Sequence, residues 1–155
     1  MAEIRENVGY EKIMPLIISQ LESGGTVCIK PYGTSMLPLI RQGKDEAVLE
    51  KHTQKAKRYD ILFYRRKNGQ FVLHRVVKFD KNGGYIIRGD HQFEYEYGIT
   101  DDDVIAVVKE IRRDGKCIRR GSLLFFKWAT WGAFSFRMMH YLRKIKHRLI
   151  KKRGE

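Results

Sequence analysis

Ser35 is the first residue in this sequence whose setting favours chemistry. It follows an apolar, strand-like run and stands within Gly33–Pro38 (GTSMLP), between a glycine and a proline. Gly33 permits backbone angles that other residues avoid, or a close approach of two backbones. A serine exposed on such a corner, with backbone N–H groups pointing the same way, suits a nucleophile beside an oxyanion site. The alternative is an ordinary serine/threonine turn between two elements.

Two further polar residues stand in settings that their own elements do not explain. His74 lies inside the apolar, β-rich run Leu73–Val77 (LHRVV), and a neutral imidazole is a suitable base for a serine proton. Asp90 follows a strand-like run in Arg88-Gly89-Asp90, where a carboxylate could orient the histidine and stabilise its cation. Taken singly, His74 is as well explained as a hydrogen-bonded histidine on a sheet face, and Asp90 as part of an ordinary Gly-Asp turn.

The elements that would position these residues form a mainly β body. Residues Ile13, Leu16, Ile17 and Leu21 recur at helical spacing, which predicts a short amphipathic helix over about 9–22. Asn68-Gly69 and Asp114-Gly115 are hairpin signals between apolar runs. Alternation and turn residues predict an antiparallel sheet within 26–120, with strands over 26–30, 46–50, 60–65, 70–78, 85–88, 104–111 and 117–119.

The formal charge of +13 on 155 residues is concentrated at the C-terminal end. Residues 112–155 hold 14 Lys/Arg and 2 Asp/Glu, which gives +12, and residues 1–111 hold 17 and 16, which gives +1. Composition changes near Gly121, so we expect a body over 1–121 and a basic, aromatic, amphipathic helical tail over 122–155. Its membrane-facing residues would be Trp128, Trp131, Arg143, Lys144, Lys146 and Arg148.

The order of these segments resembles the boxes of type I signal peptidases and LexA-like serine peptidases. The nucleophile box is Gly33–Pro38, and Leu73–Val77 resembles the next box, with a histidine where many bacterial members have a lysine. Tyr85–Asp90 matches the Gly-Asp box, and Val104–Val108 matches the strand that follows it. The resemblance covers residues 25–111 and is to a Ser-His variant without an N-terminal membrane anchor.

The resemblance implies the family's coiled antiparallel sheet and a serine-type endopeptidase that cleaves an extended peptide, such as a leader or signal segment, in trans. Ser35 would be the nucleophile, His74 the general base and Asp90 the acid that orients the site. The nucleophile loop would comprise Gly33, Thr34, Ser35, Met36 and Pro38. Family members usually carry Asn and a later Asp or Ser after Gly-Asp, whereas this chain reads HQFEYE, which leaves the third member open.

Several alternatives remain open at this point. The chain could be an inactive peptide-binding module of the same fold, or a LexA-like regulatory protein, although the segment before Ser35 contains no Ala-Gly or Cys-Gly cleavage pair. The tail could pack on the body, lie on an anionic membrane or form a short span. Nucleic acid is disfavoured as a partner, and no motif calls for a cofactor or metal. We expect a cytoplasmic or peripherally membrane-associated bacterial protein.

Overall fold

The computed structural model describes residues 8–127 together with Met138 and Tyr141. The described chain is mainly β, as the sequence predicts, with an antiparallel sheet of eight strands and two short helices. The strands run in the order β1-β2-β7-β3-β4-β5-β6, and β8 pairs with residues 110–113 of β7, beyond the residues of β7 that pair with β3. The elements are α1 (Val8–Glu22), β1 (Val27–Ile29), β2 (Glu46–Lys51), β3 (Ile61–Arg65), β4 (Phe71–Phe79), β5 (Tyr85–Arg88), β6 (Glu96–Ile99), the 3₁₀ turn η1 (Asp101–Asp103), β7 (Val104–Arg113), β8 (Lys116–Arg119) and α2 (Leu123–Lys127).

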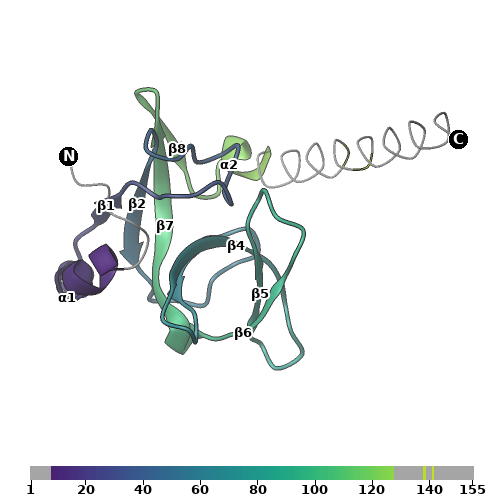
Figure 1. Cartoon of the computed structure of the whole chain (residues 1–155), viewed down its shortest axis with the longest axis horizontal. Helices are drawn as coiled ribbons and strands as arrows, with labels where there is room; N and C mark the ends of the chain where they lie inside the picture. The colour runs from purple at the N-terminus through teal and green to yellow at the C-terminus, as the bar shows by residue number, and fades with distance from the viewer. Residues whose placement is uncertain (1–7, 128–137, 139–140, 142–155) are drawn as a thin grey trace, which may run out of the picture.

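The sheet is strongly coiled, and Figure 1 shows β4 curling round so that β4, β5 and β6 enclose one side of the molecule. The helix α1 lies beside β1 and β2 on the other side (Figure 1). One predicted hairpin turn has the required backbone geometry: Asp114 and Gly115, which link β7 to β8, both have positive φ, at 48° and 73°. Positive φ at both positions defines the two-residue hairpin turn that matches strand twist.

Each face of the coiled sheet has its own hydrophobic core. In β3, Ile61 and Phe63 contribute to a first core, whereas Leu62 and Tyr64 contribute to a second core inside the curve of β4–β6. Side chains of a strand alternate between the two faces, so a strand buried on both faces reads as a continuous apolar run. This explains the uninterrupted segment Ile61–Tyr64.

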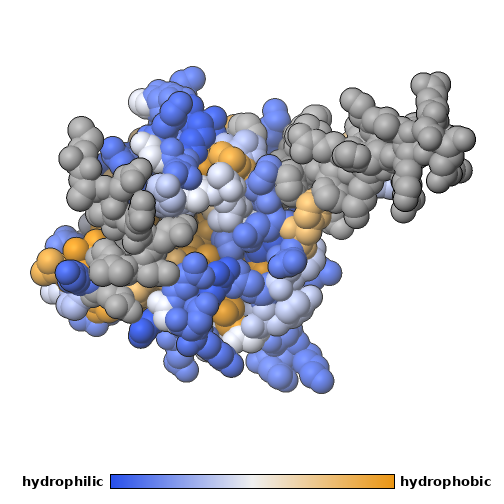
Figure 2. Space-filling model, viewed as in Figure 1, coloured by the Kyte–Doolittle hydropathy of each residue, from blue (hydrophilic) through white to orange (hydrophobic). Residues whose placement is uncertain are grey.

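The helix α1 turns a different face to the body from the one that the spacing predicted. Ile17 and Leu21 are buried in the first core, but their third partner is Met14, and Leu16 is 72% exposed. Figure 2 shows hydrophobic side chains gathered over α1 on the visible face of the molecule. The apolar residues of α1 surround most of the helix, so the sequence alone did not determine which of them would meet the sheet.

The body extends beyond Gly121, where the composition changes. Phe125 of α2 is 1% exposed and packs in the first core, and its ring lies 4.9 Å from the guanidinium carbon of Arg75. The first turn after Ser122 therefore belongs structurally to the β body. The tail residues beyond Lys127 that the sequence singled out lie outside the described residues.

A buried ion pair joins β4 to the turn that follows β5. Arg75 donates from Nε and Nη2 to the two carboxylate oxygens of Asp90, both at 2.7 Å, and from Nη1 to the carbonyl of Tyr59 at 2.8 Å. Arg75 and Asp90 are 2% and 3% exposed. The paired geometry satisfies both charges without water, so removal of either partner leaves an uncompensated buried charge.

We expect Asp90→Ala to lower the free energy of unfolding by about 3–5 kcal/mol, because Arg75 would stay buried without its carboxylate. Urea denaturation followed by far-UV circular dichroism would measure this. Asp102→Ala is the control, since Asp102 is exposed on η1, and it should change stability by less than about 0.5 kcal/mol. A loss below about 1 kcal/mol for Asp90→Ala would contradict the role that we assign to this pair.

Candidate active site

Ser35 lies in the loop between β1 and β2, which three buried side chains anchor to the body. Gly33 has φ +98°, and a Cβ there would meet no atom within 4 Å, so its backbone angle and not crowding requires glycine. Met36, Leu39 and Ile40 are buried, and the N–H of Ile40 donates to the carbonyl of Met36 at 3.0 Å. The loop is therefore held by its apolar side, and Ser35 remains partly exposed.

The carbonyl of Ser35 contacts the turn that follows β5. It accepts a hydrogen bond of 2.8 Å from the N–H of His91. A Cβ on Gly89 would lie 2.7 Å from the same carbonyl oxygen, closer than real Cβ atoms approach, so only glycine fits there. The two residues of the Gly-Asp segment therefore have different roles. Gly89 lacks a Cβ and so allows the Ser35 carbonyl to approach, whereas Asp90 binds Arg75.

The strand register places this contact near His74. The last pair between β4 and β5 is Arg75 with Arg88, and beyond it the chain of β5 continues antiparallel to β4, in the direction of His74. Ser35 contacts this continuation at residues 89 and 91. The Ser35 loop therefore contacts the chain just beyond the end of the β4–β5 ladder. Ser35 and His74 are 39 positions apart in the sequence, and no hydrogen bond joins them in the described chain.

His74 is buried and is oriented by a carboxylate. Its Nδ1 lies 2.8 Å from Oε1 of Glu96 and 3.3 Å from the hydroxyl of Tyr64, and its side chain is 2% exposed. An ionised carboxylate can only accept, so we assign the proton of a neutral imidazole to Nδ1. This tautomer leaves a lone pair on Nε2, for which no hydrogen-bond partner is found among the described residues.

Glu96 is held in its ionised form by three donors. Tyr64 donates to Oε2 at 2.8 Å, and Arg66 donates from Nε to Oε2 at 2.8 Å and from Nη2 to Oε1 at 2.5 Å. Burial by itself would raise the pKa of Glu96, but the hydrogen bonds from His74, Arg66 and Tyr64 outweigh it and hold the pKa well below its usual range. Burial and the Glu96 carboxylate raise the pKa of Tyr64, so its hydroxyl stays protonated and can donate.

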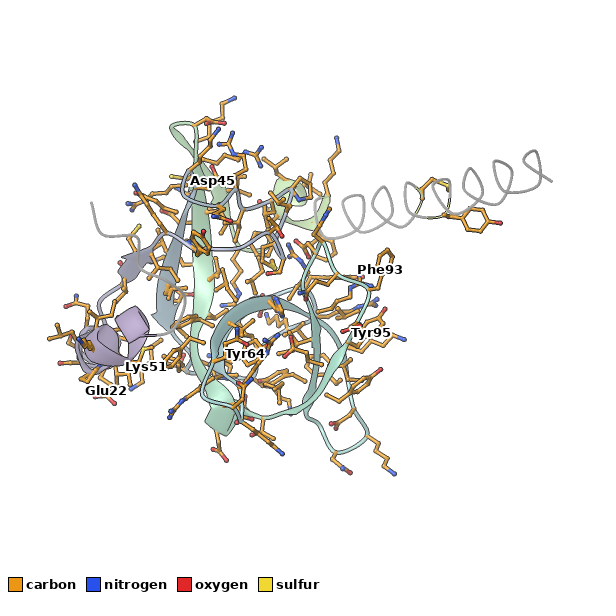
Figure 3. All side chains as sticks on the ribbon, in the orientation of Figure 1. Glu22, Asp45, Lys51, Tyr64, Phe93 and Tyr95 are labelled. Atoms are coloured by element: carbon orange, nitrogen blue, oxygen red, sulfur yellow. The ribbon has the colours of Figure 1, made fainter. Side chains whose placement is uncertain are left out.

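The sheet register explains why Glu96 reaches the histidine. Glu96 pairs with Ile87 across β5 and β6, and His74 pairs with Leu62 across β3 and β4. Ile87 and Leu62 both belong to the second core, and cross-strand partners project to the same face, so the two polar side chains converge inside the curve. Figure 3 shows Tyr64 within this curve.

The structure therefore corrects the role that the sequence gave to Asp90. The acid that contacts His74 is Glu96, while Asp90 is engaged on both oxygens by Arg75. The sequence predicted no strand between 85–88 and 104–111, so Glu96, in the segment HQFEYE, stood outside the predicted sheet. The available signal was the alternation of Glu94, Tyr95, Glu96 and Tyr97, which is compatible with a short strand.

The remaining predicted residues differ in how far the structure describes them. In the nucleophile loop, Thr34 is exposed and Pro38 is partly buried, with a cis peptide bond between Leu37 and Pro38. In the tail, Met138 and Tyr141 are exposed helical residues. The tail residues that the sequence assigned to a membrane surface lie outside the described residues, namely Trp128, Trp131, Arg143, Lys144, Lys146 and Arg148.

No protein-family model, curated protein or solved structure matches this chain. Among the residues that the structure describes, none of the helices combines the length and the apolar character needed to cross a membrane. The described His, Cys, Asp and Glu side chains form no group of three or more that could hold a metal ion.

The stability of the chain should depend on pH through Glu96. Its pKa is depressed in the folded state, so its contribution is complete above the pKa of the unfolded chain, about 4.3, and is lost as pH falls below that value towards the folded pKa. We expect Glu96→Gln to be less stable than the parent by roughly 1–3 kcal/mol at pH 7, and this difference to shrink below about pH 4.

Urea denaturation at a series of pH values from 7 to 3 measures this difference. Glu94→Gln is the matched control, because Glu94 is an exposed carboxylate two residues away, and its curve should follow that of the parent. Parallel curves for Glu96→Gln and the parent over the whole series would show that the Glu96 contacts do not stabilise the ionised carboxylate.

Proposed function

We propose that this protein is a serine-type endopeptidase that cleaves an extended peptide in trans. The observation that carries the proposal is the contact between His74 Nδ1 and Glu96, made beside the edge of β4 that the Ser35 loop approaches. A carboxylate on one imidazole nitrogen and a free lone pair on the other is the arrangement that a general base needs. The order of the sequence boxes, which resembles signal peptidases and LexA-like peptidases, supports the same reaction.

In the proposed reaction, the hydroxyl of Ser35 attacks the carbonyl carbon of the scissile peptide bond while His74 Nε2 takes its proton. The imidazolium then donates this proton to the leaving amine as the carbon–nitrogen bond breaks, which leaves an acyl-enzyme on Ser35. A water molecule, deprotonated by His74, then attacks the carbonyl carbon of the ester. His74 returns the proton to Ser35 Oγ as the carbon–oxygen bond breaks, which releases the acid product and regenerates the serine hydroxyl. Glu96 orients the imidazole and stabilises its cation in both halves of the reaction.

The backbone N–H of Ser35 would stabilise the oxyanion that forms in both steps. No backbone hydrogen bond of this N–H is found within the described residues, so the donor is available. Asp90 enters this scheme as a positioning residue, since its ion pair with Arg75 holds the turn against which the Ser35 carbonyl rests.

A peptide-binding module without catalysis is the second candidate. It is favoured by the lack of a hydrogen bond between Ser35 and His74 in the described chain. Such contacts can be long in a ligand-free enzyme and shorten only when substrate binds. Covalent labelling separates the two candidates, because only an activated serine reacts with a phosphonate.

We expect a fluorescent peptidyl phosphonate to label the full chain, and Ser35→Ala to abolish labelling while the circular dichroism spectrum stays unchanged. His74→Gln should reduce the labelling rate at least about a hundredfold, since general-base catalysis contributes about 10²–10⁴. The control is Ser19→Ala, which removes an exposed hydroxyl of α1. Undiminished labelling of Ser35→Ala would eliminate Ser35 as nucleophile, and an unlabelled parent chain would favour the binding module.

We also propose that the basic tail binds an anionic membrane surface. Residues 112–155 carry +12, and seven aromatic residues lie between Phe125 and Tyr141. In α2, the described start of this region, Leu123 is 91% exposed and Phe126 is 43% exposed, so large apolar groups are accessible beside the basic residues. Apolar groups that enter the interface and cations that meet anionic headgroups together give such binding.

Vesicle flotation tests this proposal. The full chain should float with vesicles that contain phosphatidylserine, and flotation should be lost in a chain that ends at Lys127, which retains the core residue Phe125. Vesicles of phosphatidylcholine alone and a salt series are the controls, since the electrostatic part weakens with ionic strength. Equal flotation of the two chains would assign membrane binding, if any, to the body.

A further inference from the structure

Arg88, at the end of β5, is a buried cation whose charge the described residues do not neutralise. Arg88 is the register partner of Arg75 and lies two positions before Asp90, and these three buried residues, here called the Arg75–Arg88–Asp90 cluster, are 2%, 9% and 3% exposed. Two guanidinium groups and one carboxylate give this cluster a net charge of +1. A buried charge without a counter-ion is costly, so proteins rarely retain one unless a ligand or partner compensates it.

The two arginines use their donors very differently. Arg75 engages Asp90 through Nε and Nη2 and the carbonyl of Tyr59 through Nη1. Arg88 makes one hydrogen bond among the described residues, from Nη1 to the hydroxyl of Tyr95 at 3.2 Å, and its guanidinium carbon lies 5.0 Å from the centre of the Tyr95 ring.

The edge of the Arg88 guanidinium that binds carboxylates is the part without partners. Nε of Arg88 is the one fully buried side-chain nitrogen or oxygen of the described chain that has no hydrogen-bond partner. Nη2 also has no partner in the described chain and, unlike Nε, is not fully buried. The Nε–Nη2 edge is the one that Arg75 uses to hold Asp90, and it fits a planar carboxylate.

The backbone of Arg88 lies one residue from the contact with the proposed nucleophile loop. Arg88 directly precedes Gly89, whose Cα faces the carbonyl of Ser35. Arg88 and Arg75 are register partners, so their side chains project from the same face of the sheet, the face of the first core that also contains Met36. Tyr95, on which the guanidinium stacks, lies on the β5 side of the molecule in Figure 3.

We propose that Arg88 binds a carboxylate of the peptide substrate and thereby makes the protein selective for acidic peptides. The proposal rests on the proposed function, because it places the carboxylate on the chain that Ser35 cleaves. The carboxylate meets Nη2 first, since that nitrogen is not enclosed, and its charge neutralises the buried cluster. The ring contact and the hydrogen bond to Tyr95 hold the planar guanidinium in one orientation, so less rotamer entropy is lost on binding.

A carboxylate on a peptide is either an acidic side chain or the C-terminal group. The test is a positional library of internally quenched octapeptides in which each position in turn is Glu or Gln, prepared with free and with amidated C-termini. Cleavage is measured as kcat/KM, and binding of the same peptides to the Ser35→Ala chain is measured by competition with a fluorescein-labelled library member. The binding arm reports selectivity even if the protein does not cleave peptides.

For the parent chain we expect Glu over Gln at one position, or a free over an amidated C-terminus, by about 10- to 100-fold, the effect of one hydrogen-bonded charge. Arg88→Gln should bring this ratio close to one, and Arg88→Lys should retain part of it, while phosphonate labelling of Ser35 persists. The control is Arg65→Gln, which removes an exposed arginine stacked 5.7 Å from the Phe71 ring and should leave the ratio unchanged.

The outcomes separate the two proposals. A ratio near one in the parent chain, in both cleavage and binding, overturns the carboxylate site. An acidic preference that Arg88→Gln leaves intact overturns it as well, because another residue must then bind the charge. Selective binding without cleavage and without labelling of Ser35 supports the carboxylate site while contradicting the peptidase.

Discussion

The buried ion pair between Arg75 and Asp90 is the constraint on which the candidate site depends. It fastens β4 to the turn after β5, and through the carbonyl of Tyr59 and the ring of Phe125 it also fastens the start of β3 and the helix α2. Gly89 in the same turn receives the Ser35 carbonyl. This buried interaction therefore holds four segments of the chain against β4, directly or through Gly89: the turn after β5, the start of β3, the helix α2 and the Ser35 loop.

Neighbouring residues of β4 serve the two faces of the sheet. Arg75 projects towards the first core, where its donors bind Asp90 and the carbonyl of Tyr59. His74 projects towards the second core, where Nδ1 contacts Glu96 and Nε2 has no hydrogen-bond partner among the described residues. Strand alternation produces this separation without any special backbone geometry. The donors around Glu96 keep that carboxylate ionised, so the imidazole is held in one orientation and one tautomer by charge as well as by packing.

The near-neutral charge of residues 1–111 conceals a pattern of paired charges. Several buried or partly buried carboxylates accept hydrogen bonds from an arginine guanidinium. These hydrogen bonds replace the water that would otherwise solvate the carboxylate and the guanidinium. Arg88 departs from this pattern, because its side chain contacts the hydroxyl and the ring of Tyr95 and pairs with no carboxylate of the described residues. Within residues 1–111 the paired groups are Arg41 with Asp45, Arg66 with Glu96 and Arg75 with Asp90, and Arg120 from the basic segment pairs with Asp60.

The sequence by itself determined the mainly β body, a helix over about 9–22, the hairpins at Asn68-Gly69 and Asp114-Gly115, and the unusual setting of Ser35 and His74. These features depend on local periodicity and on backbone angles that few residues adopt. Only the tertiary structure decided that His74 meets Glu96 and that Asp90 meets Arg75. Both acids follow the histidine in the chain, and the choice between them depends on strand register and sheet curvature, which arise from long-range packing and not from local sequence.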